Sequence, residues 1–87
     1  MKQTVQYNKT LTAYRVENEN DLDELLTEEF GEHTTIYKTG NKIRISASGN
    51  DVSPAKFEFG DWVIRINNET IETYTDDEFN KYFKVVV

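Results

Sequence analysis

Carboxylate side chains are the groups in this sequence that could do chemistry, and they are concentrated in residues 17–32. No lysine or arginine occurs in this segment. If the segment is helical, the five acids between positions 21 and 29 span roughly 12 Å, because a helix rises about 1.5 Å per residue. The eight acids of the segment are Glu17, Glu19, Asp21, Asp23, Glu24, Glu28, Glu29 and Glu32.

This density of negative charge is comparable to that of a nucleic acid. One charge per roughly 2–3 Å is within a factor of two of duplex DNA, which carries one per about 1.7 Å. The functional hypothesis is a DNA-mimicking face that occupies a basic groove on a nuclease or another DNA-binding protein. The alternative is a solvated helix face, which is what runs of charge usually form.

Other residue types that carry chemistry lack suitable partners. His33 is the only histidine, and the sequence has no H-x-x-x-H or H-x-E spacing for a metal site. Ser46, Ser48 and Ser53 lie in no nucleophile-elbow motif, and no glycine-rich phosphate loop is present. A carboxylate pair for glycoside chemistry stays open, although so small a domain offers little cleft. We therefore expect no enzyme activity, cofactor or metal.

Composition narrows the class of protein and the kind of partner. The 87 residues predict one small domain, 1–87, with a thin core. No cysteine, signal-peptide core or membrane-length apolar run occurs, which favours a reducing cytoplasm. The net charge of −6 opposes binding to nucleic acid or anionic membrane, and we see no basic stripe for single strands. A basic protein is the natural partner, unless the charge serves only solubility.

A first helix, over residues 21–30, is predicted to carry most of these acids. Leucines and a phenylalanine form one apolar stripe on it, at positions 22, 25, 26 and 30. Asn18 or Asn20 is the expected N-cap, and Gly31 the expected stop. Because Glu29 falls near the apolar side, we expect the last turn to fray or to turn outward.

Residues 57–83 predict strand, turn, strand and capped helix. Trp62 and Ile64 alternate with Val63 and Arg65, the period of a half-buried strand. Asn67-Asn68 predicts a two-residue hairpin turn with positive φ at both positions. The returning strand, 70–74, ends at a capping box formed by Thr75 and Glu78. Capping also accounts for the acids at 76–78, which belong to a second acidic group with Glu69 and Glu72.

The remaining segments predict further strands joined mostly by tight turns. Residues 4–16 are extended, with a change of parity between Ala13 and Tyr14 that indicates a bulge or burial on both faces. Residues 34–38 and 42–48 form a predicted hairpin, and the apolar tail, 85–87, is a further strand or an edge contact. The fold class is therefore α+β: a single small domain with an antiparallel sheet of about five strands and two short helices.

Aromatic residues could serve either packing or recognition. Trp62 is either a core residue or an interface anchor, and a lone tryptophan on an alternating strand is more often core. The tyrosines either pack with their hydroxyls in water or line a ligand cleft; they are Tyr7, Tyr14, Tyr37, Tyr74 and Tyr82.

The order of these signals resembles a family of small phage and prophage accessory proteins of uncharacterised function. The family ends on a G-D-W-[IV]-[IV] strand and an F-x-x-x-[YF] helix, which are matched here by GDWVI at 60–64 and FNKYF at 79–83. The first strand, 9–14, and the helix at 21–30 correspond more loosely. The resemblance implies a phage-encoded protein and brings no catalytic residue with it.

We therefore predict a non-catalytic, phage-encoded inhibitor of the anti-restriction or anti-CRISPR type. Its predicted partner is a basic host defence or DNA-handling protein. The contact residues are the eight acids above, with the hairpin at Asn67 and Asn68 as a second contact. Two alternatives stay open: a protein that binds or sequesters a small ligand, as a monomer or as a homo-oligomer, and a phage structural or assembly protein.

Overall fold

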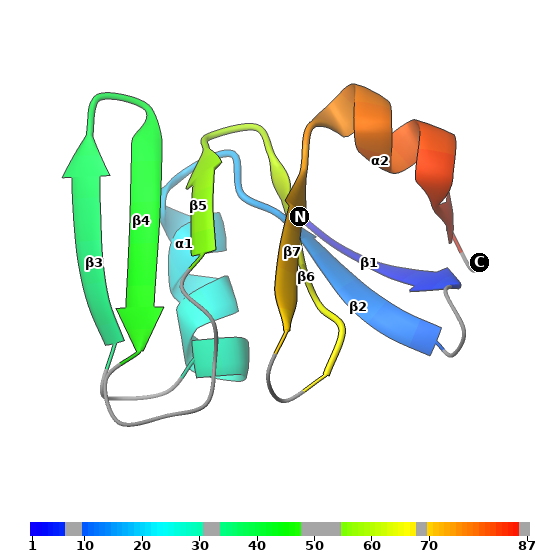
Figure 1. The fold of residues 1–87 in the computed structure, drawn as a ribbon, viewed down its shortest axis with the longest axis horizontal. Coiled ribbons are helices and arrows are strands. Elements are labelled where there is room, and N and C mark those ends of the chain that lie inside the picture. The colour runs from blue at the N-terminus through cyan, green and yellow to red at the C-terminus, as the bar shows by residue number, and fades with distance from the viewer. Residues whose placement is uncertain (7–9, 31–33, 48–54, 68–69, 86–87) are drawn as a thin grey trace.

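The computed structural model describes residues 1–6, 10–30, 34–47, 55–67 and 70–85. Within these residues, eight strands form two antiparallel sheets, accompanied by two short helices (Figure 1). The prediction of a single α+β domain with antiparallel pairing is confirmed. The strands divide between two sheets, however, whereas the sequence led us to expect one.

The larger sheet has the strand order β7-β6-β2-β1-β8, and the smaller one has the order β3-β4-β5. The larger sheet consists of β1 (Lys2–Gln6), β2 (Thr10–Arg15), β6 (Trp62–Arg65), β7 (Ile71–Tyr74) and β8 (Lys84–Val85). The smaller sheet consists of β3 (Thr34–Thr39), β4 (Lys42–Ala47) and β5 (Ala55–Glu58). The helices are α1 (Glu19–Leu25), which continues as the π-helix η1 (Leu26–Phe30), and α2 (Asp76–Tyr82).

Both faces of the larger sheet are buried, each in its own core cluster. Trp62 and Ile64 point to one face and pack with Phe79 and Phe83 at α2. Val63 points to the other face and joins a cluster that contains residues of α1 and of the smaller sheet. β2 divides in the same way, because Ala13 belongs to the first cluster and Tyr14 to the second, which confirms burial on both faces. Figure 1 shows α2 on one side of the larger sheet, with α1 and the smaller sheet on the other.

Trp62 is a core residue, in agreement with the more common role of a lone tryptophan. Its side chain is 3% exposed and stacks on Phe79 with the ring centroids 3.7 Å apart. The indole N–H donates a hydrogen bond of 2.9 Å to the Asp76 carboxylate. The predicted capping box is also present, since the Thr75 hydroxyl accepts from the Glu78 amide and the Glu78 carboxylate accepts from the Thr75 amide. Together these contacts fix the start of α2 on the sheet.

The turn between β6 and β7 differs from the prediction. Asn67 does not have a positive φ, and the amides of Ile66 and Asn67 both donate to the Thr70 carbonyl. A hydrogen bond from Ile66 to Thr70 encloses three residues, so the turn is longer than the two-residue hairpin that the paired asparagines suggested. The β3–β4 hairpin is confirmed, with Gly40 at φ 62° in its turn.

Candidate functional site

The acidic face is built on α1, which begins two residues earlier than predicted. The Asn18 side chain accepts a hydrogen bond from the Asp21 amide, so the N-cap is one of the two that the sequence offered. Leu22 and Leu25 are buried and hold the helix on the core. Their burial leaves Asp23, Glu24 and Glu28 exposed, on the side of the helix away from the leucines.

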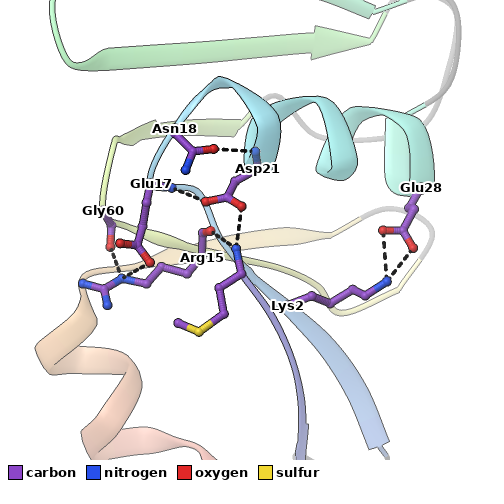
Figure 2. A network of polar contacts seen from close by, with 8 residues as sticks. Lys2, Arg15, Glu17, Asn18, Asp21, Glu28 and Gly60 are labelled. Atoms are coloured by element: carbon purple, nitrogen blue, oxygen red, sulfur yellow. Dashed lines mark hydrogen bonds and ion pairs between the residues drawn. The ribbon is translucent and has the colours of Figure 1, made fainter.

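Asp21 contacts the first residue of the chain and so links β1 to the start of α1 (Figure 2). Its carboxylate lies 2.7 Å from the ammonium group of Met1 and accepts a hydrogen bond from the Glu17 amide. The hydrogen bond from the Met1 ammonium, above all, lowers the pKa of Asp21 below its usual value. Glu17 lies 3.8 Å from the Arg15 guanidinium. These two acids therefore belong to an internal network.

Two further acids of the helical segment pair with lysines from β1 and β3. The Lys2 ammonium pairs with the Glu28 carboxylate (Figure 2), with the nearest oxygen 2.9 Å away, and this hydrogen bond raises the pKa of Lys2. A carboxylate oxygen of Glu19 lies 2.8 Å from the Lys38 ammonium. The absence of lysine and arginine from residues 17–32 led us to expect an uncompensated row of charge. That expectation is wrong for Glu17, Glu19, Asp21 and Glu28, because cations distant in sequence reach them.

Asp23 and Glu24 keep the character that the sequence predicted. Both are exposed, and neither forms an ion pair within the described part of the chain. Glu24 is near enough to Lys2 to contribute to its raised pKa. The open part of the acidic face therefore consists of Asp23 and Glu24, flanked by the paired acids Glu19 and Glu28.

Glu29 departs from the row because the helix widens. Residues 26–30 form a π-helix, and the Arg65 guanidinium donates a 2.7 Å hydrogen bond to the Glu29 carbonyl. The side chain is half-buried, which raises the pKa of Glu29 despite the opposing effect of Arg65. The predicted outward turn is therefore wrong: an extra residue in the turn lets the helix end stay packed.

The second predicted contact lies next to this helix end. Asn67 is exposed and lines a shallow hollow together with Arg65 and Glu29. The structure thus brings part of the hairpin and part of the acidic segment together. Glu32 and Asn68 lie outside the described residues, as does the predicted stop at Gly31.

A cluster of cations on the smaller sheet was missed from the sequence. Lys42, Arg44 and Lys56 are exposed and line one groove with Tyr37. They come from two strands that only the pairing of β4 with β5 brings together. Arg44 alternates with Ile43 and Ile45 in the sequence, a pattern that is compatible with an outer face but does not tell which residues of a neighbouring strand lie beside it.

The described residues contain no group of three or more histidine, aspartate, glutamate or cysteine side chains that could hold a metal ion. His33 lies outside them. Within the same described ranges, neither helix has the length and apolar character needed to cross a membrane.

Comparison with known proteins gave no match, either to a family model, to a curated protein or to a solved structure. The resemblance to small phage proteins therefore stays a prediction.

Proposed function

We propose that this protein is a non-catalytic, phage-encoded inhibitor that binds the basic surface of a host defence or DNA-handling protein. The contact is the exposed face of α1, with Asp23 and Glu24 at its centre. The observation that carries the proposal is that these two acids are exposed and form no ion pair within the described residues. A partner's arginine or lysine gains a charge-assisted hydrogen bond there without displacing an internal one.

The flanking acids join the contact by exchanging partners. Glu28 and Lys2 are 38% and 42% exposed in their side chains, and Glu19 and Lys38 are 61% and 43% exposed. Ion pairs this exposed are worth about 0–1 kcal/mol, so a cationic groove that offers bidentate arginines outcompetes them. The net charge of −6 adds long-range attraction to a basic partner.

The hairpin supplies the second contact. Asn67 and Glu29 share a hollow at the C-terminal end of the helical segment, so a partner that follows the helix also reaches the hairpin. Such a protein acts in the cytoplasm of the infected host cell, where its target handles DNA.

Quantitative affinity capture from a bacterial lysate tests the proposal. The bait is compared with Asp23→Asn/Glu24→Gln and with a control, Glu58→Gln/Asp77→Asn, which removes the same number of exposed charges elsewhere. Capture is repeated at about 50 mM and about 300 mM salt, since screening shortens the reach of exposed charges. We expect a basic, DNA-binding protein on the wild-type and control baits that is lost from the Asp23/Glu24 variant and at high salt. Equal capture by all three baits would sink the proposal, as would capture that salt does not change.

A further inference from the structure

The outer face of the smaller sheet carries a compact group of cations beside an exposed ring. Arg44 on β4 lies opposite Tyr37 on β3 and opposite Lys56 on β5, so the three form one row across the sheet. Lys42 lies two residues from Arg44 and shares its face, opposite Thr39 and Glu58. This face points away from the core, since Ile43 and Ile45, which alternate with Lys42 and Arg44 along β4, are buried.

The side chains on this face are open to a ligand. Tyr37 is 58% exposed, and the guanidinium carbon of Arg44 lies 5.9 Å from the centre of its ring. Within the described residues, Lys42, Arg44 and Lys56 form no ion pair. These side chains line a groove of about 620 Å³, a volume typical of small-molecule sites, which range over roughly 300–1,000 Å³.

The spacing of the cations indicates the size of the anion. Neighbouring strands lie about 4.8 Å apart and residues two positions apart on a strand about 7 Å apart, so all three cations fall within reach of one diphosphate or triphosphate group. Cations that follow a long nucleic-acid strand would be spread along it instead. The acidic remainder of the surface also repels a long polyanion.

We propose that this groove binds a nucleotide. Its phosphates lie on Lys42, Arg44 and Lys56, and its base stacks on the Tyr37 ring. The phosphorylated end of a single strand also presents a base beside a phosphate, although it lacks the contiguous phosphates of a nucleoside diphosphate or triphosphate. The proposal concerns a different surface from the acidic face of α1 and does not depend on it.

Two carboxylates also line the groove, and their positions are compatible with this ligand. Asp61 accepts a hydrogen bond of 2.9 Å from the Glu58 amide, which holds it at the β5 turn. Glu58 lies opposite Lys42, in the row next to that of Arg44 and Lys56. A carboxylate beside a phosphate site can accept hydrogen bonds from ribose hydroxyls, as in dinucleotide-binding folds.

Titration of isotope-labelled protein with ATP, followed by amide chemical shifts and calorimetry, tests the proposal. Pyrophosphate and a short thymidine oligomer are the comparison ligands. The groove variants are Tyr37→Ala and Arg44→Gln/Lys56→Gln. The chain offers a matched control on α2, where Tyr82 is 61% exposed and the Lys81 ammonium lies 5.6 Å from its ring centre; the control variants are Tyr82→Ala and Lys81→Gln.

We expect saturable ATP binding that shifts amides of β3, β4 and β5. Arg44→Gln/Lys56→Gln should weaken it at least about tenfold, because charge-assisted contacts to phosphate are lost. Tyr37→Ala should weaken ATP and spare pyrophosphate, and the α2 variants should leave affinity within about twofold of wild type. If the thymidine oligomer binds more tightly than ATP and is weakened by the same groove variants, the nucleotide that the groove binds is the end of a single strand. No saturable binding, equal affinity for pyrophosphate and ATP, or equal losses in the α2 variants would each overturn the assignment.

Discussion

Three glutamates of the same helical segment meet three different environments. Glu24 is exposed to water, Glu28 is bound to the Lys2 ammonium, and Glu29 is half-buried against the hairpin. The free energy of ionising each side chain depends on that environment, because burial penalises a carboxylate and a nearby cation favours it. A row of acids in a sequence is therefore not a uniform row of charge in the folded protein.

Glu29 gives a prediction at this scale. Burial raises its folded-state pKa above 4.5, so the folded state binds more protons than the unfolded state just above that pH. The contribution of Glu29 to stability therefore falls as pH rises through its folded-state pKa. Glu29→Gln should raise the free energy of unfolding at about pH 7 and change it much less at about pH 4, where the Glu29 carboxyl is largely protonated in both states.

Urea denaturation at both pH values measures this difference. Glu24→Gln is the matched control, because its exposed side chain should change stability by less than about 0.5 kcal/mol at either pH. A Glu29→Gln protein that is less stable than wild type at about pH 7 would show that the attraction of Arg65 exceeds the cost of burial.

Local interactions could be predicted from the sequence, and distant ones could not. The Asn18 cap and the Thr75–Glu78 box involve residues three apart, so the pattern alone predicted the box and narrowed the cap to Asn18 or Asn20. The pairs Glu28–Lys2 and Glu19–Lys38 join residues 26 and 19 positions apart. No periodicity encodes such a contact, and so the compensation of the acidic segment was missed.

At the scale of the elements, α2 depends on its first turn. Thr75→Ala removes the hydroxyl that accepts from the Glu78 amide and should lower the free energy of unfolding by about 1 kcal/mol. Thr75→Ser keeps an acceptor and should lose a few tenths at most. Thermal or urea unfolding of the two variants checks this. Equal losses in both would show that the methyl group, and not the cap, matters.

The elements themselves were largely predictable because their periods are clear. The alternation at residues 62–65 and the stripe at 22, 25 and 30 correspond to β6 and to the buried side of the first helix. The predicted two-residue turn after β6 was wrong at Asn67, because asparagine permits a positive φ but does not require it. The π-helix at residues 26–30 was also missed, since it depends on how Arg65 and the core hold the helix end.

At the scale of the whole molecule, the second sheet is the feature that the sequence did not reveal. Alternation shows that a strand has one buried face, but not which sheet it joins. Val63 shows the effect of the second sheet. It alternates with Trp62 and Ile64 and so lies on the other face of β6, where α1 and the smaller sheet bury it. The pairing of β4 with β5 in this second sheet also brings Lys42, Arg44 and Lys56 together in one groove, although the net charge of the protein is −6.

We propose two independent binding surfaces of opposite charge: the acidic face of α1 and the groove on the smaller sheet. The central claim is that the acidic face occupies a partner's groove that otherwise binds DNA. The most direct test is competition for the captured partner between this protein and a labelled DNA duplex. Wild type should displace the duplex, and Asp23→Asn/Glu24→Gln should need at least about tenfold more protein to do so. A ternary complex, in which the partner holds the duplex and this protein together, would contradict the claim.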